Sequence, residues 1–193
     1  MKDPRPVSIE VRRQSSHQTH VQIYSQTGGK QRIHAEGTVR HEHCQSLGVL
    51  TPPQLQDAQS RVRAGLYPHR FPNGPVFQVI ETMELGRNHV ARAHLALTSP
   101  PPEGGFLPMT LMDGAFQVES ATRSGFDRYS GLPKHFTSMV WMPGFAQVEQ
   151  ALCIATTEDD STTSLGELWF VDSQQRILSH LQGLTLTAQV PRL

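Results

Sequence analysis

The chain of 193 residues lacks several features that mark common classes of protein. Its two cysteines, Cys44 and Cys153, are too few for a disulfide framework, which favours a cytoplasmic protein. The formal net charge is zero, and this argues against a nucleic-acid-binding surface, because such a surface needs clustered Lys and Arg. No run of about 18 apolar residues is present, so we expect no membrane span. The opening ten residues also lack the apolar core of a signal peptide.

Motifs for metal and nucleotide chemistry are missing as well. The sequence has no Cys/His pattern with zinc spacing, no Gly-rich phosphate loop and no Gly-x-Ser-x-Gly nucleophile motif. His41 and His43 are two residues apart, a spacing that suits a metal ion on a strand, but no third ligand lies near them in the sequence. We therefore predict no metal site.

Alternating apolar and polar side chains predict three strands at the start of the chain. These strands cover 7–13, 19–25 and 32–40, and they form an antiparallel meander with one solvent-exposed face. Three strands are a poor core by themselves, so we expect another segment to cover their apolar face. A connector follows, and the polar run from Gln54 to Ala64, placed after two prolines, predicts a short exposed helix.

The rest of the chain is predicted to be one sheet and one long helix. Further strands are predicted at 76–85, 89–98, 135–142, 147–157, 164–172 and 176–188. The helix is predicted over 107–127, between the second and third of these strands. A sheet wrapped around one buried helix is the α+β layout of a hotdog fold.

The helix predicted over 107–127 has so little polar surface that we expect it inside the protein. Asp113 and Gln117 are four residues apart and therefore share one face of it. Gly114 costs about 1 kcal/mol relative to Ala in a helix interior, which suggests the close approach of another backbone or a ligand. The alternative is an acid that merely favours the helix dipole, next to a solvated glutamine.

Three short motifs resemble those of the polyketide synthase dehydratase family. They are Gly74-Pro75-Val76-Phe77, Asp113-Gly114-Ala115-Phe116-Gln117 and Leu132-Pro133-Lys134-His135. In that family they correspond to the end of a Gly-Tyr-Gly-Pro loop, an Asp-x-x-x-Gln (or His) motif on the central helix, and a Leu-Pro motif. The closing stretch 168–186 is similar to the family's last hairpin. The opening stretch 7–39 is similar to the last strands of its first hotdog.

The resemblance implies a double hotdog of which this chain carries the later part. Residues 1–43 would be the terminal strands of a first hotdog, and 44–66 would be a linker. Residues 67–193 would be the second hotdog, which carries the Asp-x-x-x-Gln helix. The chain would work as a homodimer or in association with the missing half-domain.

The resemblance also implies an activity, that of a lyase in a polyketide or fatty-acid synthase. Asp113 would protonate the hydroxyl that leaves a 3-hydroxyacyl thioester, and Gln117 would orient that acid. The substrate-binding residues implied are Gly74, Pro75, Phe77, Leu132, Pro133 and His135. The substrate would arrive on the phosphopantetheine of an acyl carrier protein, and no cofactor would be bound directly. A carboxyl can act as such an acid only if burial raises its pKa toward the working pH.

Two departures from the family pattern affect this interpretation. Asn73 stands where the family usually has a tyrosine that shapes the pocket. The family's catalytic base, a histidine in a His-x-x-x-Gly-x-x-x-x-Pro motif, would precede the opening strands, so we expect this chain alone to be incomplete. Two alternatives stay open: a dehydratase-like isomerase or cyclase, and a non-catalytic hotdog that binds acyl chains or mediates dimerisation.

Overall fold

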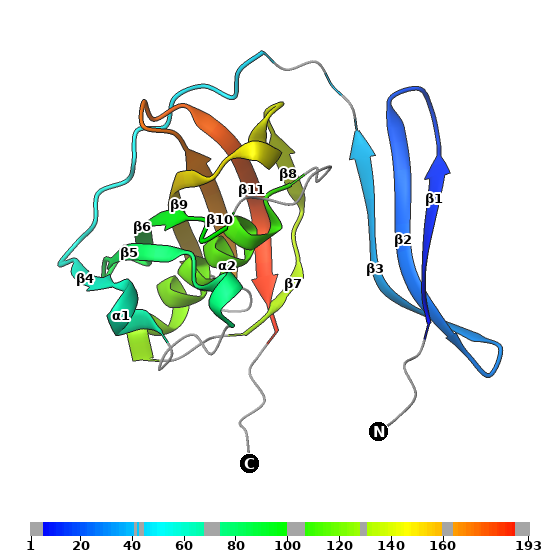
Figure 1. Ribbon diagram of the computed structural model, residues 1–193, viewed down its shortest axis with the longest axis horizontal. Coiled ribbons are helices and arrows are strands. Elements are labelled where there is room, and N and C mark those ends of the chain that lie inside the picture. The colour runs from blue at the N-terminus through cyan, green and yellow to red at the C-terminus, as the bar shows by residue number, and fades with distance from the viewer. Residues whose placement is uncertain are drawn as a thin grey trace. The chain divides into compact units, whose positions relative to one another are not determined.

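The computed structural model describes residues 6–40, 42, 45–67, 74–99, 107–127, 131–159 and 164–187. These residues fall into two compact units, Met1–Cys44 and Gln45–Leu193 (Figure 1). None of the described helices is both long enough and apolar enough to cross a membrane.

The first unit is a three-stranded antiparallel sheet, as the sequence predicts. It consists of β1 (Val7–Arg13), β2 (Gln18–Thr27) and β3 (Lys30–Arg40), with β2 in the middle. Gly28 and Gly29 both have positive φ, which permits the tight two-residue turn between β2 and β3. Val7, Ile9 and Val11 of β1 share one face and are exposed within this unit.

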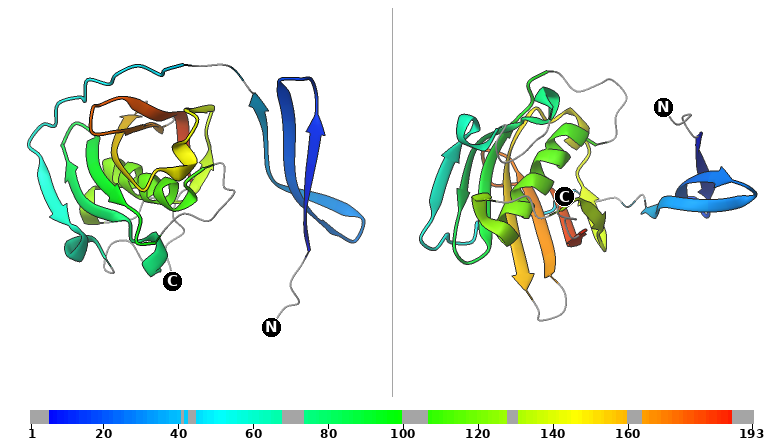
Figure 2. Two further views of the ribbon diagram at one scale, coloured as in Figure 1. Left: turned by 45° about the horizontal axis from the view of Figure 1, so that its top comes forward. Right: turned by 90° about the horizontal axis from the view of Figure 1, so that it is seen from below.

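The second unit is an eight-stranded antiparallel sheet that curves around a single long helix (Figures 1 and 2). The order along the sheet is β4 (Gln59–Val62), β5 (Ile80–Leu85), β6 (Val90–Ala96), β9 (Gln150–Asp159), β10 (Ser164–Val171), β11 (Ile177–Leu186) and β7 (Pro133–His135). The short strand β8 (Ser138–Trp141) also pairs with β11. The helix α2 (Met109–Ser124) lies along the inner face, and this arrangement confirms the predicted hotdog fold.

The core of the second unit forms between α2 and the inward-facing side chains of the central strands. Leu111, Ala115 and Val118 of α2 are fully buried. The sheet contributes the buried side chains Ala93, Cys153 and Leu168, among others. Burial of these apolar side chains stabilises the fold. Burial also raises the pKa of the Cys153 thiol, so this cysteine is an inert packing residue.

Gly114 in α2 is a point of close approach, although not of the kind expected. A Cβ at this position would collide with the side chain of Val79, and Leu95 lies just beyond it. The nearest neighbour is therefore the side chain of Val79, which directly precedes β5, rather than another backbone. The glycine thus lets the helix pack closely on Val79 and on Leu95 of β6.

Our prediction of a helix from Gln54 to Ala64 is wrong. Residues Gln59–Val62 form β4, which pairs with β5, and only a single helical turn follows it, α1 (Arg63–Leu66). The backbone of Gln56 binds Asn88 and Arg87 in the turn after β5. Pairing with the sheet thus overrides the helix propensity of a polar segment. It also places the last part of the predicted linker, 44–66, within the second unit.

The strand predicted over 135–142 is divided into β7 and β8. These two strands pair with β11 on either side of Gly183, whose φ is 68°. A Cβ at Gly183 would collide with Thr137, so β11 bends there and Thr137 sits between the two short strands. One-turn 3-10 helices complete the fold: η1 (Pro75–Phe77), η2 (Gly125–Asp127) and η3 (Phe145–Gln147).

Candidate active site

Asp113 and Gln117 form a hydrogen-bonded pair on the inner helix. Asp113 lies in the second turn of α2 and is half-buried, whereas Gln117, one turn further on, is 0% exposed. Gln117 Nε2 donates to Asp113 Oδ2 at 2.7 Å. The alternative of a solvated glutamine is therefore wrong, because this side chain lies in the core with the acid as its partner.

The Gly-Pro loop meets this pair through a backbone carbonyl. Gly74 and Pro75 lead into η1, and the carbonyl oxygen of Phe77 accepts a hydrogen bond from Gln117 Nε2 at 3.2 Å. Two of the three motifs identified in the sequence are thus brought together in space. The roles assigned to Gly74, Pro75 and Phe77 in binding substrate stay predictions.

Tyr67 completes the set of partners of Gln117. It follows α1, is 5% exposed, and its hydroxyl donates to Gln117 Oε1 at 2.8 Å. Burial raises the pKa of this phenol well above its ordinary value, and the negative charge of Asp113 acts in the same direction. The sequence signal for Tyr67 is modest: an apolar pair, Leu66-Tyr67, in an otherwise polar stretch.

The third motif lies on β7, at the end of the sheet, whereas the other two lie on η1 and α2. Leu132 is 63% exposed, and Pro133 and His135 are exposed on β7, where they pair with β11 at the end of the sheet. The hydrogen bonds described for Gln117 come instead from Tyr67, which follows α1, and from Phe77 in η1. A role for Leu132, Pro133 and His135 in binding substrate stays a prediction.

A buried ion pair anchors the C-terminal half of α2. Arg123 Nε donates to Glu119 Oε1 at 2.6 Å, and both side chains are largely shielded from solvent. The same guanidinium also donates to the carbonyl oxygens of Ser164 and Leu184, each at 3.0 Å, in β10 and β11. This arrangement fixes the rotation of α2 about its own axis, and with it the direction in which Asp113 points.

Three histidines have structural partners that account for their positions. His89 Nδ1 is 2.8 Å from the carbonyl oxygen of Thr122, and the His180 ring stacks on Trp169 with centroids 4.8 Å apart. In the first unit, His34 Nε2 is 2.9 Å from Ser25 Oγ. Within the described ranges, no group of three or more His, Cys, Asp or Glu side chains is arranged to hold a metal ion.

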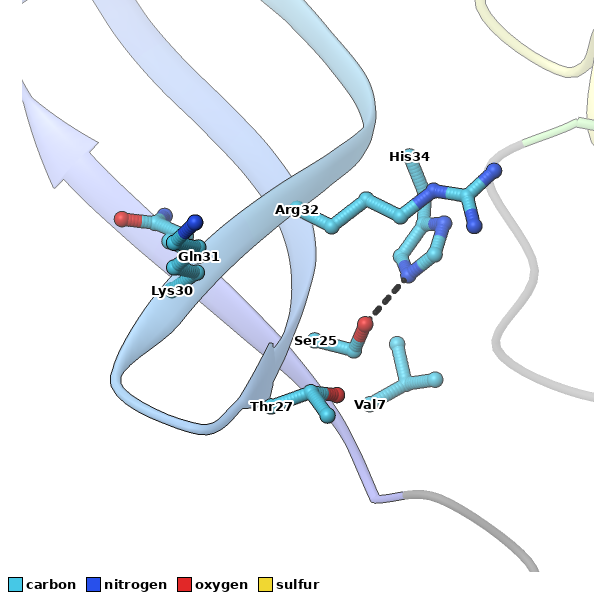
Figure 3. Close-up of a pocket in the computed structure, with 7 residues that line it drawn as sticks. All are labelled: Val7, Ser25, Thr27, Lys30, Gln31, Arg32 and His34. Atoms are coloured by element: carbon cyan, nitrogen blue, oxygen red, sulfur yellow. Dashed lines mark hydrogen bonds between the residues drawn. The ribbon is translucent and has the colours of Figure 1, made fainter.

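Two surface hollows are described, and neither is the site of the acid. One, of about 360 Å³, lies in the first unit beside the hydrogen-bonded His34 and Ser25 (Figure 3). The other, of about 280 Å³, lies on the second unit. It is lined by Ser60, Thr82, Glu84, Arg92, His94 and Leu152. Asp113 lines neither of them.

Comparison with known proteins gives a family and a fold. The family model for the polyketide synthase dehydratase N-terminal domain matches residues 48–191. No curated protein sequence matches the chain. Several solved structures are similar in fold throughout most of the chain.

The similar structures are dehydratase domains. One is from the CurF module of curacin polyketide synthase, with a TM-score of 0.71 and 20% identity; the match covers 95% of this chain and 69% of that one. The dehydratase domain of RzxB from Pseudomonas fluorescens has a TM-score of 0.69 and 16% identity, and the match covers 92% of this chain and 66% of that one. The dehydratase domain of the polyketide PpsC from Mycobacterium tuberculosis has a TM-score of 0.69 and 18% identity, and the match covers 95% of this chain and 68% of that one. At these identities the likeness shows the fold alone, and the chain spans about two thirds of the length of these domains.

Proposed function

Because the chain belongs to the polyketide synthase dehydratase family, we propose that it supplies the acid of a dehydratase that removes water from 3-hydroxyacyl thioesters. The substrate is carried on the phosphopantetheine of an acyl carrier protein. The observation that carries the proposal is the half-buried Asp113, hydrogen-bonded to the fully buried Gln117 on the inner helix. No metal or nucleotide takes part.

Two proton transfers accompany the loss of water. A base removes the proton from C2 of the acyl chain, and the electron pair of the broken C2–H bond becomes the second bond between C2 and C3. Asp113 gives its proton to the hydroxyl on C3, the bond between C3 and oxygen breaks, and water leaves. Asp113 is then a carboxylate, which the Gln117 N–H stabilises through a charge-assisted hydrogen bond. The carboxylate regains a proton before the next turnover.

The environment of Asp113 suits this role better than a purely structural one. A polar pair inside a hotdog core is costly unless every hydrogen bond is made, and an apolar residue would stabilise the helix more simply. Here Gln117 satisfies both of its amide hydrogens and its carbonyl oxygen. The core thus maintains a carboxyl on a face that is only half-buried, where a substrate hydroxyl can approach it.

We assign the base to a histidine outside the Asp113 unit. His89 and His180 already contact other groups of that unit, and His135 is exposed on β7. A histidine from an associated hotdog, either a second copy or another half-domain, then faces Asp113 across the substrate. Asp113 is only half-buried in its own unit, so its carboxyl is open to such a partner.

Chemical rescue tests this proposal, because imidazole in solution can replace a missing histidine. The purified chain is incubated with a 3-hydroxyacyl pantetheine thioester, and the enoyl product is measured by mass spectrometry. Water loss should rise with imidazole concentration and should fall about 100-fold in Asp113→Asn, the typical contribution of a positioned acid. Equal rates in both proteins would overturn the assignment of Asp113. Rapid, Asp113-dependent water loss without imidazole, in a chain that is monomeric in solution, would overturn the assignment of the base to another unit.

A further inference from the structure

The hydroxyl of Tyr67 lies at the far end of the chain of hydrogen bonds that holds the acid. It donates to Gln117 Oε1 at 2.8 Å, while Gln117 Nε2 donates to Asp113 Oδ2 at 2.7 Å. We propose that Tyr67 is a positioning residue: it fixes the orientation of the Gln117 amide, so that Gln117 always presents N–H to Asp113. This inference rests on the proposed role of Asp113 and deepens it.

The orientation of a glutamine amide is a chemical choice between two states. Rotation by 180° about the last side-chain bond exchanges its oxygen with its NH2 group at almost no steric cost. In the rotated state Oε1 would face Asp113 Oδ2 and the Phe77 carbonyl oxygen, which are both acceptors when the acid is ionised. Only a partner that must donate, placed on the other side of the amide, removes this ambiguity.

Tyr67 meets this requirement because its phenol keeps its proton and its oxygen already accepts a backbone hydrogen bond from Ile80. The side chain is buried, and the groups whose charges act on it are Asp113 and Arg63. The Phe77 carbonyl oxygen is also within reach of the hydroxyl, but at the longer distance of 3.5 Å. The hydroxyl therefore donates mainly to Gln117 Oε1, and both amide hydrogens are directed to Phe77 and Asp113.

The consequence for the acid is directional. Asp113 Oδ2 accepts the N–H of Gln117 and so cannot carry the acidic proton along the same line. The acidic proton then resides on Oδ1, the oxygen that does not accept from Gln117. Tyr67 thus selects, through Gln117, which carboxyl oxygen delivers the proton, although it touches neither the acid nor the substrate.

The test is Tyr67→Phe, which removes one oxygen and keeps the ring. Tyr24→Phe, the same change on β2 of the first unit, is the matched control. In Tyr67→Phe the Gln117 amide can rotate, so its side-chain NH2 should lose protection from hydrogen exchange. The titration of the Asp113 carboxyl is followed by 13C NMR. Its midpoint should rise by about 0.5 to 1 pH unit, because the carboxylate loses a steady N–H donor. Imidazole-rescued water loss should fall about three- to tenfold in kcat with KM nearly unchanged. Tyr24→Phe should change none of these.

Two further measurements separate the possible outcomes. In a Gln117→Met background, Tyr67→Phe should no longer move the Asp113 midpoint, because the group that transmits its effect is gone. In the unmutated protein, nuclear Overhauser effects should connect the Gln117 NH2 protons to Phe77 rather than to the Tyr67 ring, and this holds whether or not the variant folds.

An amide that is oriented the other way in the unmutated protein, or an Asp113 midpoint that Tyr67→Phe leaves in place, would overturn the inference. Its failure is distinguishable from failure of the proposed function. A shifted midpoint in a protein that never removes water would retain Tyr67 as the orienting residue and reject the dehydratase. Asp113-dependent water loss with an unmoved midpoint would retain the dehydratase and reject Tyr67 as the orienting residue.

Discussion

Gln117 Nε2 and Asp113 Oδ2 are joined by a hydrogen bond of 2.7 Å across one turn of α2. The donor is fully buried and the acceptor is half-buried, so the bond connects the core of the hotdog to the face where a substrate would bind. The helix that carries both groups is anchored at its other end by the buried pair of Glu119 and Arg123.

Gln117→Met should lower the stability of the second unit. The substitution leaves the Tyr67 hydroxyl and the Phe77 carbonyl oxygen without the partner they have now. Unsatisfied buried polar groups cost about 1–3 kcal/mol each, so we expect the free energy of unfolding to fall by about 2 kcal/mol. Urea unfolding followed by tryptophan fluorescence reports on this unit alone, since Trp141 and Trp169 both lie in it. An unchanged midpoint would show that the network contributes nothing to the fold.

Gly114→Ala should destabilise the protein even though alanine is the better helix former. The added Cβ collides with Val79, and overpacking of this kind costs about 1–3 kcal/mol, against a gain of about 1 kcal/mol in helix propensity. Gly65→Ala in α1 is the matched control, because a Cβ there meets only Arg61 Cδ at an ordinary 3.6 Å. Thermal melts should show a lower Tm for Gly114→Ala and no decrease for Gly65→Ala. The same Tm for both variants would contradict the close packing of α2 on the sheet.

Glu119→Gln should be among the more damaging conservative substitutions. It leaves the Arg123 guanidinium, largely buried, without its carboxylate, and breaking one side of such a pair costs about 3 kcal/mol. Asp57→Asn is the control, because the Asp57–Arg87 pair spans 3.5 Å between two exposed side chains and should be worth less than about 0.5 kcal/mol. Urea titrations of both variants measure the difference. If the two variants lose similar stability, Glu119 does not anchor α2.

Asp172→Asn should change stability in a pH-dependent way. Burial pushes the pKa of Asp172 upward, but the N–H groups of Arg176 and Gln174 and the Arg176 guanidinium outweigh this, so the pKa is lower than its ordinary value. The charged form therefore stabilises the folded chain above the unfolded pKa of about 3.9, and this stabilisation is lost as the pH falls through the lower folded pKa.

The Tm difference between the unmutated protein and Asp172→Asn should accordingly be present at pH 7 and disappear toward pH 2. Asp57→Asn provides the comparison, since the Asp57–Arg87 pair joins two exposed side chains. A difference for Asp172→Asn that stays constant over this range would show that shape rather than charge determines the stability of the β10–β11 turn.

The elements with a clear periodicity are the ones that the sequence predicts well. Strict alternation predicts β1, β2 and β3, and the apolar stripe predicts α2, because these patterns arise from burying one face of a strand or helix. The polar run that forms β4 has no such pattern, and its strand conformation comes from pairing with β5, a partner distant in sequence. Local propensity cannot report a contact of that kind.

The same distinction holds at the candidate site. Asp113 and Gln117 are recognisable because both lie on one helix at a spacing of one turn. Tyr67 and the Phe77 carbonyl oxygen are not recognisable, since they reach Gln117 only after α1 and η1 fold against α2, and one of them is a backbone atom that every residue possesses. The Glu119–Arg123 pair has the ordinary spacing of a surface salt bridge, and only the structure places it in the core.

The central claim, that Asp113 meets the hydroxyl of a 3-hydroxyacyl thioester, is tested most directly by 13C NMR of the Asp113 carboxyl. The protein, labelled at its aspartate carboxyl carbons and assigned with Asp113→Asn, is titrated with a 3-hydroxyacyl pantetheine and, separately, with the saturated acyl pantetheine of equal length. The account predicts that the hydroxylated ligand moves the Asp113 resonance and that the saturated ligand leaves it nearly in place. Saturating binding of the hydroxylated ligand with an unmoved Asp113 resonance would contradict it.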